Sequence, residues 1–203
     1  MAFPCQIWCC FLLSQGRHEA PQLRLLLLRH AKSDWSGKAD DHARPLSARG
    51  KRTAPRIGAC MHAKGYEPEL VLCSTAERTK ETLELVLPVF AGQPQIRYDR
   101  SLYLAEWPEL LAKIRTVSSG ATPLMVVGHN PGLEQLAIAL ALQAPSAAER
   151  GRLQKLAQKF PTAALAVLDF EIADWSEVKP GLGRLIDYVR PKDLNGENGG
   201  DDE

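Results

Sequence analysis

The stretch LRLLLLRHAKSDW, residues 23–35, decides the fold. Its leucines fill both alternating faces of an extended segment, 24–29, which is typical of a central strand in a parallel sheet covered by helices on both sides. The apolar run stops at Arg29 and His30. A buried strand that ends in two polar groups delivers them to one edge of its sheet. Polar residues at the ends of the other strands are therefore expected to meet them.

Downstream of this stretch, apolar segments of strand length alternate with longer segments of helical periodicity. This alternation predicts one α/β domain, a three-layer sandwich in which a mostly parallel central sheet has helices on both faces. The last two expected strands, 163–172 and 183–191, are joined by a loop rich in proline and glycine and are predicted to be antiparallel to each other. The other expected strands are 69–74, 96–98 and 123–128, and the expected helices are 45–65, 76–90, 107–117, 131–142 and 146–159.

Local signals predict where two of these helices begin and end. Ser47 is expected to cap the first helix, and Gly65 is expected to stop it. Pro55 predicts a break or kink inside this helix, because proline lacks an N–H donor and clashes with the preceding turn. Thr75 or Ser74 is the expected cap of the next helix.

Composition limits the classes of partner. The 203 residues are 45% hydrophobic, which is enough to fill one core. The 25 Lys and Arg residues nearly balance the 24 Asp and Glu residues, so we expect neither nucleic acid nor a membrane as partner. Residues 29–56 are an exception, because basic residues outnumber acidic ones there and would attract an anion. The basic residues are Arg29, Lys32, Lys38, Arg44, Arg49, Lys51, Arg52 and Arg56, against Asp34, Asp40 and Asp41.

Cysteine content and the two ends of the chain complete this outline. Five cysteines, three of them within the first ten residues, favour a reducing compartment such as the cytoplasm. Residues 1–22 are apolar but lack a basic start and a clear cleavage site, so we expect a disordered extension or a misplaced start codon, with a targeting segment as the alternative. The domain itself is expected to span 23–194. Residues 195–203 are predicted to be a disordered, acidic tail.

Three of the expected strands end in groups that bind or attack anions. Arg29 and His30 end the first strand, Arg78 lies one turn into the helix after the second, and His129 follows the strand 123–128. Ligands of open α/β sheets bind at the carboxyl ends of the strands, so these side chains are expected at one crevice. Two histidines and two arginines there predict a site for phosphate or a similar oxyanion, with one histidine able to carry the phosphoryl group. This chemistry requires neither a metal nor a cofactor.

Three motifs also resemble a known family. The segments LLRHAKSDW (27–35), CSTAERTKET (73–82) and VVGHNPG (126–132) resemble the histidine phosphatase superfamily, with its Arg-His-Gly motif, its Ser-x-x-x-Arg helix start and its second histidine after glycine. RPLSARGKR (44–52) makes the chain most similar to the SixA-like phosphohistidine phosphatases. The resemblance covers about residues 23–194 and implies a phosphoglycerate mutase-like fold.

The resemblance implies a role for each matching residue. His30 matches the nucleophile that becomes phosphorylated, and Arg29 and Arg78 match the arginines that hold the phosphoryl oxygens. His129 matches the second histidine, which donates to the same oxygens. Ser36 matches a position where sugar-phosphate mutases often place a phosphate-binding asparagine.

The sequence departs from the family pattern in two places. Ala31 replaces a glycine found in many members, as is familiar in the SixA-like branch. The acid that protonates an alcohol leaving group has no clear counterpart, and Glu106 is the nearest candidate. An imidazole leaving group can carry its own proton, so the preferred substrate is a phosphorylated protein, phosphorylated on histidine. A small phosphate ester remains an alternative substrate.

Other readings of the same residues also predict distinct outcomes. A metal hydrolase built on His30 and His129 would need a third ligand, for which Asp34 is the only carboxylate nearby. A phosphoprotein-binding module would keep the site without turnover. Arg78 alone fits a surface ion pair with Glu81 or Glu84.

Cys73 lacks the Cys-x5-Arg loop of cysteine phosphatases and is expected to be a buried thiol. His18, His42 and His62 are expected at the surface or in loops.

Overall fold

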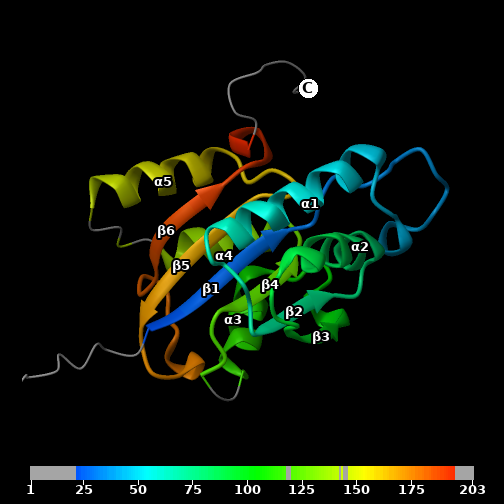
Figure 1. Cartoon of the computed structure of the whole chain (residues 1–203). Helices are drawn as coiled ribbons and strands as arrows, with labels where there is room; N and C mark the ends of the chain where they lie inside the picture. The colour runs from blue at the N-terminus through cyan, green and yellow to red at the C-terminus, as the bar shows by residue number, and fades with distance from the viewer. Residues whose placement is uncertain (1–21, 118–119, 142, 144–145, 195–203) are drawn as a thin grey trace, which may run out of the picture.

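The computed structural model describes residues 22–117, 120–141, 143 and 146–194. Our predictions for the extension 1–22, apart from residue 22 itself, and for the tail 195–203 lie outside these residues. The described chain forms one six-stranded sheet, in the order β3-β2-β4-β1-β5-β6 (Figure 1). The strands are β1 (Gln22–Arg29), β2 (Leu70–Ser74), β3 (Gln95–Asp99), β4 (Leu124–Gly128), β5 (Leu165–Glu171) and β6 (Arg184–Val189).

The sheet is mostly parallel, as predicted. β1 pairs in parallel with β4, and β2 pairs in parallel with both β4 and β3. β5 is antiparallel to β1 and to β6, which confirms the predicted antiparallel pair at the end of the chain. Arg29 lies opposite Gly128, and Cys73 lies opposite Val127. The carboxyl ends of β1, β2 and β4 are therefore level with one another.

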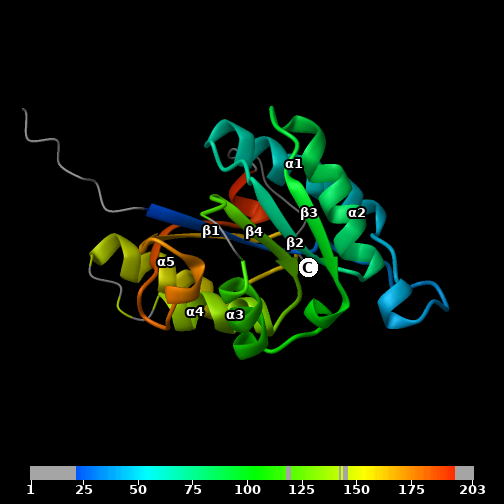
Figure 2. The same cartoon turned by 90° about the horizontal axis from the view of Figure 1, so that it is seen from below.

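Five α-helices complete a three-layer sandwich. Figure 2 shows α1 and α2 on one face of the sheet and α3, α4 and α5 on the other. The leucines of β1 explain why both faces are covered: Leu25 and Leu27 pack in the core beneath α3–α5, and Leu26 and Leu28 pack in the core beneath α1 and α2. The helices are α1 (Ala48–Ala63), α2 (Glu77–Val86), α3 (Trp107–Arg115), α4 (Gly132–Leu140) and α5 (Ala147–Gln158).

Short 3-10 helices occupy several connections. Two of them, η1 after β1 and η3 after β3, lie next to the site described below. They are η1 (Asp41–Ala43), η2 (Leu87–Val89), η3 (Arg100–Leu102), η4 (Trp175–Glu177) and η5 (Pro191–Leu194). No helix in the described ranges is both long enough and apolar enough to cross a lipid bilayer.

The predicted ends of α1 are confirmed. The Ser47 hydroxyl accepts a hydrogen bond from the Gly50 N–H at 3.1 Å. Gly65 has φ +69° just beyond the helix, where its N–H donates to His62 and the next N–H donates to Met61. Of the predicted break or kink at Pro55, the break is wrong, since α1 continues through this residue. Proline removes one hydrogen bond, and the buried neighbours packed on the sheet hold the helix on either side.

The predicted cap of α2 is also wrong. Ala76 is the N-cap residue and makes no side-chain capping bond. The Ser74 hydroxyl lies instead 2.9 Å from Nε2 of His129. The Ser74 side chain therefore makes a tertiary contact, although the local sequence predicts that it caps α2.

Candidate active site

His30 is fixed at the end of β1 by contacts on all sides of its backbone. Its N–H donates to the Gly128 carbonyl at 3.1 Å, and its own carbonyl accepts from the Ala163 N–H at 3.0 Å. The following N–H, that of Ala31, donates to the Thr82 hydroxyl at 2.9 Å. Strands β1 and β4, helix α2 and the loop before β5 thus converge on this residue.

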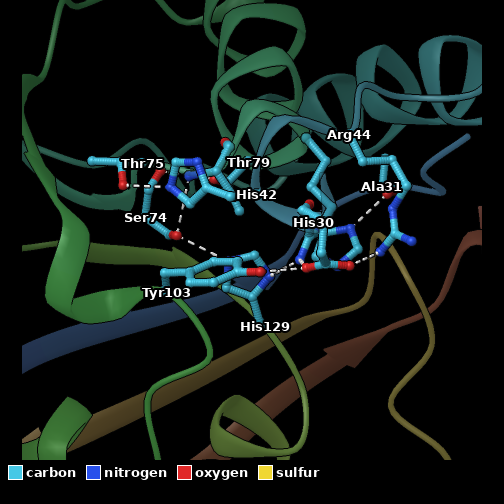
Figure 3. A network of polar contacts seen from close by, with 12 residues as sticks. His30, Ala31, His42, Arg44, Ser74, Thr75, Thr79, Tyr103 and His129 are labelled. Atoms are coloured by element: carbon cyan, nitrogen blue, oxygen red, sulfur yellow. Dashed lines mark hydrogen bonds and ion pairs between the residues drawn. The ribbon is translucent and has the colours of Figure 1, made fainter. Parts of the chain in front are cut away.

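The imidazole of His30 is held in one tautomer. Its Nδ1 atom lies 2.7 Å from the carbonyl oxygen of Ala31 (Figure 3). A carbonyl oxygen only accepts, so Nδ1 carries the proton and Nε2 keeps its lone pair. Burial lowers the pKa of His30 to about 3, helped by the positive charges of Arg78 and Arg29 and opposed by the bond to Ala31. His30 is therefore a neutral, buried base or nucleophile at neutral pH.

His129 lies beside His30 and has the opposite tautomer. The two ring centroids are 5.2 Å apart. Nδ1 of His129 accepts a hydrogen bond from Nη2 of Arg78 at 3.3 Å, because a guanidinium only donates. Its Nε2 therefore carries the proton and donates to Ser74. Burial, with the charge of Arg78 and the neighbouring His30, lowers the pKa of His129 to about 3.

Arg29 and Arg78 reach the same place from two different elements. Arg29 donates from Nη1 to the carbonyl oxygen of Phe160 at 2.6 Å, and Asn130 donates to this same oxygen at 3.0 Å. Arg78 is almost wholly buried, with 2% of its surface exposed. Its Nη1 donates to the backbone carbonyl of Asp41, and its Nη2 donates to the Asp41 carboxylate at 3.1 Å. Arg78 therefore contacts His129, and the charge of Arg29 acts on both His30 and His129.

Four residues that we did not assign to the site complete it: Asp41, His42, Arg44 and Tyr103. Asp41, from η1, contacts Arg78, Arg44 and the hydroxyl group of Tyr103. The Tyr103 ring lies edge-on to His129 and to His42, at centroid distances of 5.4 and 4.8 Å (Figure 3). His42, which we expected at the surface or in a loop, lies half-buried in η1 and contacts Tyr103 and Thr75. The only signal in the sequence was an acidic residue inside a basic segment.

Several buried polar atoms of these residues lack a hydrogen-bond partner. Within the described part of the chain, the buried side-chain atoms without a hydrogen-bond partner are Nε of Arg29, Arg44 and Arg78, together with Oδ1 of Asn130. Buried N–H groups are normally paired, because leaving one unpaired costs about 1–3 kcal/mol. Three guanidinium groups with free donors beside two neutral imidazoles form an arrangement suited to an oxyanion.

Two predicted residues lie apart from this cluster. Ser36 is exposed, and its hydroxyl donates to the Asp34 carboxylate at 2.8 Å. Glu106 is exposed at the start of α3, where its N–H donates to Glu109 at 2.9 Å. Within the described part of the chain, the contacts of Ser36 and Glu106 do not reach His30 or His129. Across the described residues, no group of three His, Cys, Asp or Glu side chains is arranged to hold a metal ion.

The remaining polar candidates have ordinary structural settings. Cys73 is buried, and burial raises the pKa of its thiol to about 12, as expected of a structural thiol. His62 is exposed and contacts Glu67. Glu81 accepts from the Leu46 N–H and pairs with Lys51 rather than with Arg78. His18 lies outside the described residues.

Comparison with known proteins places the chain in a family. Residues 25–107 match the model of the histidine phosphatase superfamily, branch 1. The chain is 36% identical over 166 residues to an uncharacterised protein of Mycobacterium tuberculosis, an alignment that covers 81% of this chain and all of that protein. Among solved structures, it is similar to SixA of Nakamurella multipartitia, with a TM-score of 0.72, 30% identity, and coverage of 85% of this chain and 98% of that one. SixA of Agrobacterium tumefaciens gives a TM-score of 0.69, 32% identity, and coverage of 83% and 98%.

Proposed function

The chain belongs to the histidine phosphatase superfamily, and from this premise we propose that it hydrolyses a phosphoryl group through a phosphohistidine formed on His30. The proposed substrate is phosphohistidine on a protein. In this proposal Arg29, Arg78 and His129 bind the phosphoryl oxygens. The reaction uses neither a metal nor a cofactor.

One observation carries this proposal: Nε2 of His30 keeps a lone pair beside the guanidinium groups. The bond from Nδ1 to Ala31 fixes the ring and its tautomer, so Nε2 needs no deprotonation before it attacks. The low pKa of His30, about 3, keeps the imidazole neutral at physiological pH. An anionic substrate would be drawn to the neighbouring arginines and would meet this lone pair.

The first step transfers the phosphoryl group from the substrate to His30. A bond forms between phosphorus and Nε2 while the bond from phosphorus to the substrate imidazole breaks, and that imidazole leaves with its proton. In this proposal, binding of the phosphoryl anion draws a proton from solvent onto Nδ1 of His129, and Nδ1 then donates to a phosphoryl oxygen in place of accepting from Arg78. Water next attacks phosphorus, the bond to Nε2 breaks, and inorganic phosphate leaves. Preorganised donors supply most of the rate enhancement in such transfers.

The carboxyl groups near the site support the choice of substrate. Bonding to Tyr103, together with the charges of Arg78 and Arg44, holds the pKa of Asp41 below its usual range, so this carboxylate is ionised and does not protonate an alkoxide. Glu106 is exposed at a helix start. A phosphohistidine substrate requires no such acid, because its leaving group is already protonated. The names of the two similar SixA proteins, both candidate phosphohistidine phosphatases, agree with this substrate.

One observation favours a second candidate, hydrolysis of small phosphate esters. Burial raises the pKa of Glu134, although the charge of Arg29 opposes the rise. Its carboxylate accepts a hydrogen bond from Asn130 at 2.7 Å. A carboxyl group with a raised pKa near Arg29 is a candidate general acid for an alcohol leaving group. A Glu134→Gln variant would then lose ester hydrolysis more than phosphohistidine hydrolysis.

The test compares phosphate release from a phosphohistidine protein, p-nitrophenyl phosphate and a sugar phosphate. We expect the highest kcat/KM for the phosphohistidine protein. A clear preference for the sugar phosphate would overturn the substrate and leave the mechanism intact. Turnover that stops with a chelator would indicate a metal hydrolase, and binding without turnover would indicate a phosphoprotein-binding module.

Variants test the mechanism. We expect His30→Ala to abolish turnover and His62→Ala, which removes an exposed histidine, to retain it. Substrate labelled with ³²P should label the wild-type protein with an acid-labile, base-stable phosphate that maps to residue 30. Full activity of His30→Ala would overturn the mechanism.

A further inference from the structure

One carboxylate links three side chains of the site. Asp41 accepts from Nη2 of Arg78, from Nη2 of Arg44 and from the hydroxyl group of Tyr103. These donors come from α2, from the loop after η1 and from the loop after η3. Figure 3 shows Arg44 on one side of this network and Tyr103 on the other. Segments far apart in the sequence are thus held by a single acidic group.

Arg78 meets Asp41 at two points. Its Nη1 contacts the Asp41 backbone carbonyl and its Nη2 contacts the Asp41 carboxylate, so both terminal nitrogens are bound to one residue. Nη2 also contacts His129. A guanidinium has five N–H donors, and these contacts leave Nε and one Nη1 hydrogen free. The plane of the guanidinium is therefore fixed while donors remain for another anion.

Arg44 is held in a similar way. Its Nη2 contacts Asp41, and its guanidinium carbon lies 3.4 Å from the centroid of the Trp35 ring. Its side chain is 12% exposed, and its buried Nε has no partner. Aromatic stacking on one side and a carboxylate on the other leave the group little freedom.

From this geometry we propose that Asp41 is a positioning residue, which aligns Arg78 and Arg44 so that both bind the phosphoryl group. The inference rests on the proposed function and adds Arg44 to its binding residues. Two guanidinium groups, of Arg44 and Arg78, share the single carboxylate of Asp41, so this network keeps a surplus of positive charge for an anion. The carboxylate and the substrate use different donors of the arginines.

A competing reading makes Asp41 an internal anion that the substrate must displace. Two observations favour positioning. The contact through the backbone carbonyl is not lost unless η1 moves, and the unpaired Nε atoms give a phosphoryl group donors that Asp41 does not use. The two readings predict opposite signs: removing the charge of Asp41 weakens anion binding under positioning and strengthens it under displacement.

The test is Asp41→Asn, with Asp40→Asn as the matched control. The control removes the same charge from the adjacent, exposed residue. We measure the dissociation constant for inorganic phosphate by titration calorimetry, kcat and KM for the phosphohistidine protein, and the thermal midpoint. For Asp41→Asn we expect weaker phosphate binding and a fall in kcat/KM, each about 10- to 100-fold. Asp40→Asn is expected to match wild type.

Further variants separate positioning from general damage to the fold. The Asp41 side chain is 45% exposed, so the thermal midpoints of both variants should be close to that of wild type. Tyr103→Phe removes one donor to Asp41 and should give a smaller loss of phosphate affinity than Asp41→Asn. Asp41→Glu keeps the charge and should recover part of the affinity that Asp41→Asn loses.

Failure of this inference differs from failure of the proposed function. Tighter phosphate binding by Asp41→Asn, or values equal to those of Asp40→Asn, would overturn the role of Asp41 while wild-type turnover stands. A wild-type protein that binds phosphate but hydrolyses none of the substrates would overturn the function, and the calorimetric comparison would still decide the role of Asp41. A wild-type protein that binds no phosphate would overturn both.

Discussion

Nδ1 of His30 and the carbonyl oxygen of Ala31 lie 2.7 Å apart, so the chain sets the tautomer of His30 with the carbonyl group of its next residue. Ala31 is held in turn by Thr82 through its N–H. The Thr82 hydroxyl accepts from the Ala31 N–H at 2.9 Å and donates to the carbonyl of Arg78 at 2.6 Å. One buried hydroxyl thus joins the backbone beside His30 to the helix that carries Arg78.

This link predicts the effect of Thr82→Val. Valine has nearly the shape of threonine but leaves the buried Ala31 N–H without a partner, so the free energy of unfolding should fall by about 1–3 kcal/mol. Because Ala31, whose carbonyl group orients His30, loses one anchor, kcat/KM should fall about tenfold. Thr53→Val is the control, since the Thr53 hydroxyl is exposed and bonds only within α1. Urea unfolding and steady-state turnover measure both effects, and equal results for the two variants would contradict the role of Thr82.

The two buried histidines predict how stability depends on pH. Burial lowers the pKa of His30 and of His129 to about 3, below the ordinary value of 6.5. Between pH 6.5 and about 4 the unfolded chain therefore binds protons that the folded chain does not. The resulting stability is complete above pH 6.5 and is lost as the pH falls, by about 1.4 kcal/mol per pH unit for each histidine.

Replacing either histidine should make this dependence shallower. His30→Asn and His129→Asn should each reduce the slope of unfolding free energy against pH over this window, and His62→Asn controls for loss of an exposed histidine. Urea denaturation at pH 7.0, 5.5 and 4.5 measures the slopes. If His30→Asn and His129→Asn both kept the wild-type slope of unfolding free energy against pH, neither imidazole would be held neutral by the fold.

The sequence predicted the parts of the site that depend on strand order. His30 and His129 meet because each follows a buried parallel strand, and Arg29 lies opposite Gly128 in the sheet. A run of leucines needs no tertiary information to be recognised as such a strand. The ends of α1 were also predictable from local sequence, since Ser47 and Gly65 act on neighbouring backbone groups. The roles proposed for the site residues stay predictions.

Asp41 and Tyr103 escaped prediction because tertiary contacts place them. Residues 31–47 have no periodicity, and their path is set by contacts such as that of Gly50, where an added Cβ would lie 2.2 Å from the Lys32 carbonyl oxygen. Ser74 was misassigned as a cap for the same reason, since its hydroxyl bonds to His129. Contacts between loops leave little trace in local composition.

Gly132 provides the last prediction, because it sets the position of the loop that carries Tyr103. A Cβ at this position would lie 2.0 Å from the carbonyl oxygen of Ala105. Real Cβ atoms do not approach a backbone oxygen so closely, so Gly132→Ala must push the loop away from α4. We expect unfolding free energy to fall by about 1–3 kcal/mol. Phosphate affinity should also fall, because Tyr103 would move from Asp41 and His129.

Gly151→Ala is the matched control for this substitution. Gly151 lies within α5, and an added Cβ there would have no atom within 4 Å. Alanine should therefore stabilise the protein by about 0.5–1 kcal/mol through its higher helix propensity, with phosphate affinity unchanged. Urea unfolding and phosphate calorimetry on both variants give the comparison. If Gly132→Ala behaved like Gly151→Ala, the close contact between α4 and the loop would not be what holds Tyr103 at the site.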